Sequence, residues 1–240
     1  SIISNIYYGT ARLVTGPFVP DQWAYNPDVK PIEFEPKEAR KVFEKAGWND
    51  TDGDGVLDRD GKKFVIEMLI PSGNKASSDQ AQIVQSTLKE VGVQMDIVRL
   101  DGPTFLQRVL EGKYQAAFLA WDLDLDPDPY ALFHSSQFPP AGQNIVFYSN
   151  PEVDKLLEAA RVEMDQAKRE ELYRAIHARL AEDQPYTWLV QISRKWGFSR
   201  RLQNVNEAKG IGYFGWYPGP LGWWIPDNQR FQEKAVAESR

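Results

Sequence analysis

The sequence predicts an α/β fold built on a mainly parallel sheet with helices on both faces. Between residues 64 and 121, short apolar segments alternate with amphipathic ones. The apolar segments are nearly continuous runs, as in strands that are covered on both faces. About a dozen residues lie between one strand and the next, which is the length that a helical crossover needs. Because only a right-handed crossover returns the chain to the same sheet, this order predicts parallel strands.

An irregular segment and one helix precede this alternating unit. Five prolines fall within residues 15–36, which predicts extended chain without regular structure. A helix is predicted over residues 36–46, because Pro36 suits a first helical turn and apolar residues follow at helical spacing. Gly47 can supply the left-handed stop.

The alternating unit contains five predicted elements. Its first helix is expected to begin at Ser78, which can cap it, and to end before Gly92. The expected elements, in chain order, are a strand over 64–70, a helix over 78–91, a strand over 93–100, a helix over 103–111 and a strand over 114–121.

Two more helices and a strand are predicted to follow. Asn150-Pro151 is typical of one helix start and Asp165 of the next. Residues 186–192 are interpreted as a strand, whereas residues 210–226 are too rich in Gly and Pro for regular structure. The last dozen residues are polar and predict an exposed tail or helix. Three tryptophans of the Gly/Pro-rich stretch are expected to be buried: Trp216, Trp223 and Trp224.

Composition excludes several classes of protein. Lys plus Arg number 28 and Asp plus Glu 34, so the net charge is −6 and nucleic acid is not an expected partner. The absence of cysteine excludes disulfides, thiolate metal sites and cysteine nucleophiles. No apolar run reaches the ~20 residues that span a bilayer. The chain opens on an apolar, aromatic stretch, and we expect that residues upstream of Ser1 are missing.

A calcium-loop pattern follows the first predicted helix. Asp50, Asp52, Asp54, Val56 and Asp58 stand at the first, third, fifth, seventh and ninth positions of such a loop. The twelfth position is glycine, where a hand-type loop has a bidentate glutamate, so the full signature is not met. The alternative is an Asp/Gly turn that needs no metal. A calcium ion bound here would be structural.

A second acidic cluster follows the third predicted strand. Residues 122–128 hold four carboxylates, directly after Trp121. Ligands of parallel sheets lie beyond the carboxyl ends of the strands. An aspartate there can hold a ligand ammonium while the tryptophan ring packs on the apolar part of the ligand. The alternative is a solvated turn in which aspartates cap helices.

The two histidines, His134 and His177, do not indicate catalysis. Neither lies in a metal-ligand spacing or beside a nucleophile motif, and the sequence has no phosphate-binding glycine loop. We predict that His177 is a surface or hydrogen-bonded residue and that His134 belongs to a loop. The aromatic residues near the end are more typical of packing than of a stacking pocket.

Short segments in a collinear order carry a resemblance to one family. They are AYNP at 24–27, EPKEAR at 35–40, AGW at 46–48, LKEVGV at 88–93, the stretch 121–129, FHSS at 133–136, Asn144, YSNPEVD at 148–154 and DQPY at 183–186. Together they resemble the family 5 extracellular solute-binding proteins, the dipeptide, oligopeptide and nickel receptors of ATP-driven importers. The likeness covers about residues 1–226.

The resemblance implies one part of a two-lobed protein of the type II periplasmic-binding class, roughly twice as long as this chain. Residues 1–35 would belong to the first lobe and the crossover, residues 36–189 to the second α/β lobe, and residues 190–240 to a return segment and polar tail. The lobes would close on a ligand without chemistry. The implied partners are a membrane permease and its ATPases. The implied location is periplasmic or extracellular, lipid-anchored through the missing N-terminal part, as a monomer without a required cofactor.

The resemblance also implies ligand-binding residues. In peptide-binding relatives an aspartate in a Trp-x-x-Asp pattern grips the α-ammonium group of the peptide, and Asp124 after Trp121 matches this position. Leu125 departs from the tyrosine that is usual at the next position. Further candidates to line the same cleft are Ser72, Asn74 and Asn144.

We therefore expect the substrate-binding component of an importer, with a peptide as the favoured ligand. One alternative is a carbohydrate receptor of the same family. Another is a carboxylate-dependent glycoside hydrolase, which needs two acids held across a cleft on separate elements, whereas the acids here crowd in one loop. A third is a calcium-dependent adhesion module built around the Asp50 loop.

Overall fold

The computed structural model describes residues 1–124, 126–193, 197–205 and 222–230. The chain divides into two compact units. The first comprises Ser1–Ala120 and Asp128–Ile192, and the second comprises Trp121–Pro127 and Ser193–Arg240. The predicted lobe boundaries at residues 36 and 190 stay a prediction. No helix of the described residues is long and apolar enough to cross a membrane.

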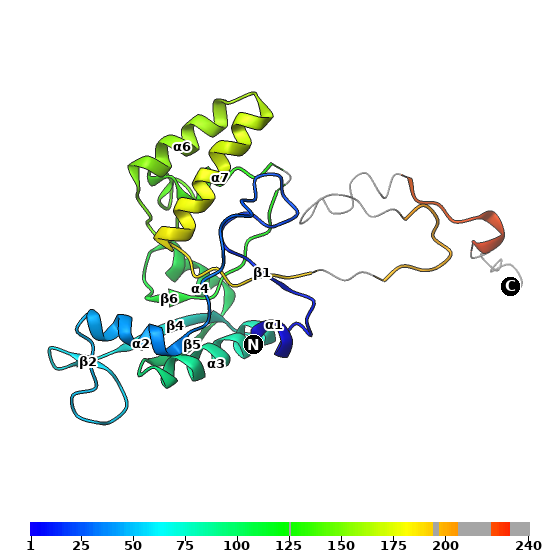
Figure 1. The fold of residues 1–240 in the computed structure, drawn as a ribbon. Coiled ribbons are helices and arrows are strands. Elements are labelled where there is room, and N and C mark those ends of the chain that lie inside the picture. The colour runs from blue at the N-terminus through cyan, green and yellow to red at the C-terminus, as the bar shows by residue number, and fades with distance from the viewer. Residues whose placement is uncertain (125, 194–196, 206–221, 231–240) are drawn as a thin grey trace, which may run out of the picture. The chain divides into compact units, whose positions relative to one another are not determined.

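A three-stranded parallel sheet is the centre of the first unit (Figure 1). Its middle strand is β4 (Val65–Pro71), with β5 (Gln94–Leu100) on one side and β6 (Ala116–Ala117) on the other. Both neighbours run parallel to β4. The crossovers are α3 (Lys75–Glu90) and α4 (Gly102–Leu110). The predicted α/β fold with a parallel sheet is confirmed.

The two crossover helices cover opposite faces of this sheet. Successive side chains of a strand point to opposite faces. Leu69 of β4 accordingly packs with Phe105 and Val109 of α4, whereas its neighbour Ile70 packs with Ala81 of α3. All five side chains are buried. Consecutive apolar side chains of β4 therefore enter two separate hydrophobic cores, one on each face of the sheet.

A hairpin and a short helix extend one end of the sheet. The helix α2 (Pro36–Lys45) and the residue Trp48 pack against a small core around Leu57, which also contains Val91 and Val93. Strands β2 (Asp58–Arg59) and β3 (Lys62–Lys63) form an antiparallel hairpin. Its two-residue turn, Asp60-Gly61, has positive φ at both positions, as the preferred hairpin turn requires.

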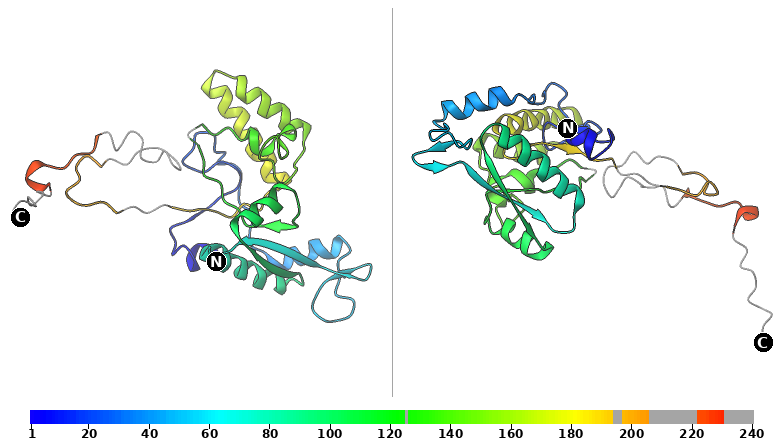
Figure 2. Two further views of the ribbon diagram at one scale, coloured as in Figure 1. Left: turned by 180° about the vertical axis from the view of Figure 1, so that it is seen from behind. Right: turned by 90° about the horizontal axis from the view of Figure 1, so that it is seen from below.

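The helical pair α6 (Pro151–Val162) and α7 (Gln166–Asp183) forms the other large core (Figure 1 and Figure 2). The side chains of Asn150 and Asp165 cap the two helices, as predicted. Two shorter helical segments, α5 (Tyr130–Phe133) and η1 (Ser135–Gln137), precede the pair. The fully buried residues of this core are Phe18, Ala24, Phe133, Val153, Leu157, Ala160, Tyr173, Ile176 and Leu180.

The ends of the chain contribute small elements. The helix α1 (Ile2–Asn5) opens the chain, and the helical turn η4 (Asp227–Gln229) lies near its end. Strand β1 (Arg12–Leu13) pairs antiparallel with β7 (Val190–Gln191). The strand predicted over residues 186–192 is therefore limited to two residues, because its partner β1 offers only two.

Two sequence predictions about the sheet region are wrong in their bounds. The helix α3 begins at Lys75 and not at Ser78, because Asn74 accepts a hydrogen bond from the Ser77 amide at 3.0 Å and asparagine is as good a cap as serine. The strand predicted over 114–121 is only β6, with one further bond from the Phe118 amide to the Leu69 carbonyl at 3.0 Å. Among the described residues, no backbone hydrogen bond joins residues 119–121 to β4.

The prediction that the late tryptophans are buried is wrong for Trp224. Its side chain is 54% exposed, although its backbone forms a bridge with Gln203. Trp216 and the predicted polar tail after residue 230 lie outside the described residues.

Gly92 offers a sharp test of this packing. It ends α3 with a φ of +85°, and a Cβ atom placed there would lie 2.8 Å from Leu57 Cγ. Gly53 has a similar φ of +77° but has nothing within 4 Å of the corresponding Cβ position. We expect Gly53→Ala to cost about 1 kcal/mol through backbone strain alone. Gly92→Ala should cost about 1–3 kcal/mol more, because it also overpacks the core. Denaturant unfolding of both variants measures the difference, and equal losses would contradict this packing.

Candidate functional site

The loop that follows β4 lines a shallow cavity at the carboxyl edge of the sheet. The Ser72 amide donates to the Leu100 carbonyl at 2.6 Å, which ties the loop to the end of β5. The cavity has a volume of about 290 Å³. Asn74 lines it, but the side-chain oxygen of Asn74 already accepts from the Ser77 amide as the α3 cap. Two of the predicted ligand-binding residues therefore share one cavity.

Sequence reasoning missed Arg99 in this cavity. Arg99 is exposed and belongs to the same cavity lining, and its guanidinium donates to Ser78 Oγ at 3.1 Å. The two-residue period of side chains along β5 could have identified it. Met95 and Ile97 pack on the α3 side of the sheet, so Arg99 projects to the same side at the carboxyl end of the strand.

Asn144 is placed differently from the other candidates. Its side chain is fully buried and makes three hydrogen bonds inside the fold. Its amide nitrogen donates to the His134 carbonyl at 3.1 Å and the Tyr148 carbonyl at 2.8 Å, while its oxygen accepts from the Tyr148 amide at 3.0 Å. Both N–H donors are thus used. A ligand contact would have to use the remaining lone pair of the side-chain oxygen.

Trp121 and Asp124 belong to the second compact unit. The Trp121 side chain is 37% exposed, and Asp124 is exposed. Among the described residues, no hydrogen bond or ion pair engages the Asp124 carboxylate. Asp128, in the first unit, instead accepts from the Tyr130 amide at 3.0 Å and from Arg161 Nε at 3.1 Å. Asp128 is therefore bonded within the first unit, whereas the Asp124 carboxylate is exposed and has no bond to another described residue.

His134 has a structural place, as predicted. It is buried and caps η1, with Nδ1 3.1 Å from the Ser136 amide nitrogen. Its Nε2 lies 3.3 Å from Glu158 Oε1. The neighbouring Ser135 is held by Asp154 through both its amide and its hydroxyl group. These contacts fasten the loop to α6.

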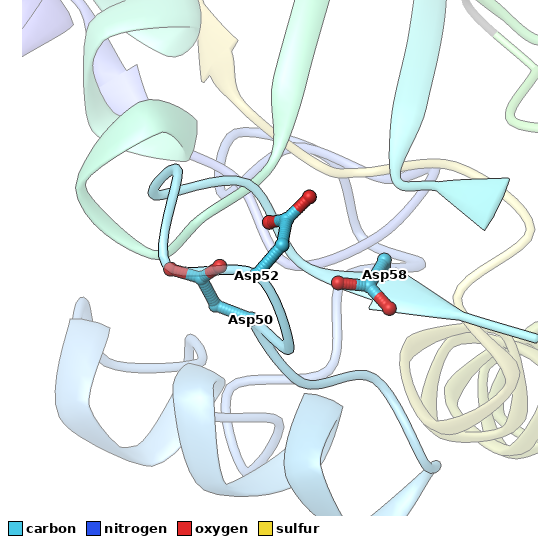
Figure 3. A group of neighbouring side chains, drawn as sticks. All are labelled: Asp50, Asp52 and Asp58. Carbon is cyan, nitrogen blue, oxygen red and sulfur yellow. The ribbon is translucent and has the colours of Figure 1, made fainter. Parts of the chain in front are cut away.

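The calcium-loop pattern brings three carboxylates together (Figure 3). Asp50, Asp52 and Asp58 each offer an oxygen within 4.8 Å of the other two. Most of these groups already have partners in the loop. Asp50 accepts from the amides of Gly53 and Gly55 at 2.8 and 2.9 Å. The arrangement provides hard oxygen ligands, the type that calcium prefers.

Lys63 places an ammonium group in this cluster. Its Nζ lies 2.6 Å from Asp52 Oδ1, 3.0 Å from Asp54 Oδ1 and 3.9 Å from Asp58 Oδ2. The hydrogen bond with Asp52 is the main cause that raises the pKa of Lys63 above its ordinary value, so the side chain stays charged. In turn, Lys63 is the main cause that lowers the pKa of Asp52. The loop therefore has a built-in cation.

Several comparisons place the chain among known proteins. Residues 1–144 match the model of bacterial extracellular solute-binding proteins, family 5 Middle. The chain belongs to this family. Its members are extracellular binding proteins and not a family of enzymes. The predicted family is therefore confirmed.

Two curated relatives illustrate the range of the family. The chain is similar to the oligopeptide-binding protein AppA of Bacillus subtilis (strain 168), with 36% identity over 79% of this chain and 35% of the relative. It is also similar to the nickel-binding periplasmic protein of Escherichia coli (strain K12), with 26% identity over 87% of this chain and 40% of the relative. The chain thus spans little more than a third of the length of these relatives.

Solved structures confirm the fold. The structure of AppA from Bacillus subtilis in complex with a nonapeptide matches with a TM-score of 0.78 and 31% identity, over 94% of this chain and 44% of that one. The structure of DppA from Helicobacter pylori in complex with the peptide STSA matches with a TM-score of 0.67 and 29% identity, over 78% of this chain and 35% of that one.

Replacing Lys63 tests whether the loop takes calcium, which stays a prediction. Calcium must displace the Lys63 ammonium, so we expect the wild-type protein to melt at the same temperature with or without ~1 mM calcium, near the affinity range of weak extracellular sites. Lys63→Met removes the competing charge and should produce a calcium-dependent rise in Tm. Asp52→Asn added to Lys63→Met should abolish that rise. If calcium raises the Tm of the wild type strongly and the Tm of Lys63→Met by the same amount, calcium and the Lys63 ammonium do not compete for the loop.

Proposed function

We propose that the protein to which this chain belongs is the substrate-binding component of an ATP-driven importer, and that it captures a peptide. The observation that carries the proposal is the similarity to two peptide-bound structures at 31% and 29% identity. A mannohexaose-bound oligopeptide-binding protein from Thermotoga maritima also shares the fold, but at 21% identity it bears on the fold alone.

The Asp124 carboxylate, which is exposed and has no bond to another described residue, supports a peptide ligand. A free peptide carries an α-ammonium group, and a carboxylate without an internal partner can form a charge-assisted hydrogen bond with it. A nickel ion would instead favour imidazole ligands, because carboxylates suit magnesium, calcium and manganese better. Among the described residues, three aspartates lie close together near the β2–β3 hairpin. The ammonium group of Lys63 already pairs with one of them, Asp52.

The proposed mechanism is capture without chemistry. Ligand binding shifts an equilibrium toward a closed form, and the closed form docks on a membrane permease that paired ATPases drive. The protein acts outside the cytoplasm as a monomer, held at the membrane by a lipid anchor, and needs no cofactor. Membership of an extracellular binding-protein family supports the location outside the cytoplasm.

A thermodynamic cycle on Asp124 tests the peptide assignment. In the full-length protein, Asp124→Asn should weaken binding of a peptide with a free amino terminus by about 10–100-fold, the cost of a charge-assisted hydrogen bond. Acetylating the peptide's amino terminus should cost the wild type a similar factor, because it removes the ammonium group. The same acetylation should leave the peptide affinity of the Asp124→Asn variant almost unchanged. Isothermal titration calorimetry measures all four combinations.

Two outcomes would overturn parts of the proposal. If acetylation weakens binding equally in both proteins, the ammonium group is held elsewhere and Asp124 is not the anchor. If no peptide binds, whereas nickel or an oligosaccharide does, the peptide assignment fails and the family assignment stands.

A further inference from the structure

His177 on α7 is a buried titratable group that the proposed ligand site does not use. Its exposed fraction is 0%, contrary to a surface position, and both ring nitrogens have partners. The backbone amide of Asn26 donates to Nδ1 at 3.1 Å, and Thr15 Oγ1 lies 3.0 Å from Nε2. Both partners come from the N-terminal segment 15–26. The histidine therefore links this segment to the helical pair.

The Asn26 amide fixes the protonation state of the ring. A backbone N–H is always a donor, so Nδ1 must keep its lone pair and the ring proton must reside on Nε2, where it is donated to Thr15 Oγ1. Protonation of Nδ1 would turn the acceptor into a second donor facing the Asn26 N–H. The two groups would then repel each other, and the bond would be lost.

The packing leaves the ring no room to adjust. A Cβ atom at Gly16 would lie 2.3 Å from His177 Cδ2 and 2.5 Å from Nε2, so the backbone of the segment touches the ring. The rings of Phe18 and Tyr25 contact it edge-on, with centroid distances of 5.7 and 5.2 Å. Rotation of the ring to a new partner is therefore blocked.

Charged neighbours of the His177 ring do not offset the effect of its burial on its pKa. One turn earlier on α7, Arg174 pairs with Glu170. On the N-terminal side, Asp28 is exposed, and Tyr25 is the titratable group that contacts the ring. Burial lowers the pKa of His177 from its ordinary value to about 4, and a hydrogen bond with the Thr15 backbone opposes this shift.

We propose that His177 is an acid-sensitive latch: its protonation breaks the bond with the Asn26 amide and releases residues 15–26 from α7. Release affects the whole helical pair, because Phe18 and Ala24 of this segment belong to the core of α6 and α7. A second link between the Asn26 side chain and the Arg174 carbonyl, 3.0 Å long, would be lost with it.

The sign of the pH dependence follows from the lowered pKa. The folded state holds fewer protons than the open state, in which the pKa of histidine is ordinary at about 6.5. The latch is therefore intact above about pH 6.5 and weakens as the pH falls toward 4. In that window each pH unit changes the ratio of open to closed forms by about tenfold.

His177→Gln in the full-length protein provides the matched control. Glutamine keeps a neutral acceptor for the Asn26 amide and a donor for Thr15, but it does not titrate. Hydrogen exchange of residues 15–26, corrected for the intrinsic pH effect, should lose protection about tenfold per pH unit below pH 6 in the wild type. The loss should be absent in His177→Gln. Equal pH dependence in both proteins would overturn the latch.

A second measurement covers the case in which His177→Gln does not fold. Nitrogen NMR of the wild-type imidazole should show Nδ1 unprotonated at pH 6 and its protonation coinciding with loss of protection of the Asn26 amide. Protonation near pH 6.5 without loss of that protection would contradict the proposal.

Discussion

The parallel pairing of β4 with β5 is the interaction on which the rest of the first unit depends. The ladder is continuous from Val65 opposite Gln94 to Pro71 opposite Leu100. Parallel strands cannot be joined by a tight turn, so the chain must cross over a face of the sheet between them. That requirement places α3, and the next crossover places α4 on the other face. It also brings Ser72 and Leu100 together at one edge, where ligands of such sheets bind.

Local patterns were sufficient to predict most elements. The run at 64–70 and the caps at Asn150 and Asp165 identify β4, α6 and α7, because their formation depends on nearby residues. Where an element ends can depend on distant contacts. β6 ends at Ala117, although the apolar run continues to Trp121, and β7 is as short as its partner β1. No local pattern in the sequence carries that information.

The candidate site shows the same limit. The position of Ser72 at the carboxyl edge follows from the strand order and was predictable. The burial of Asn144 was not, because it depends on a loop that folds back on His134 and Tyr148. Lys63 enters the aspartate group because the β2–β3 register sets it opposite Asp58. The sequence allows an Asp/Gly turn as the alternative to a calcium loop, and the structure has such a turn at Asp60-Gly61.

Our central proposal, that this chain carries the ammonium anchor of a peptide receptor, rests on the family assignment and on the exposed Asp124 carboxylate. The most direct measurement is a crystal structure of the full-length protein with a bound peptide. The account predicts the peptide's α-ammonium nitrogen within about 3.2 Å of an Asp124 carboxylate oxygen. A peptide whose amino terminus is held by another group, with Asp124 still facing solvent, would contradict it.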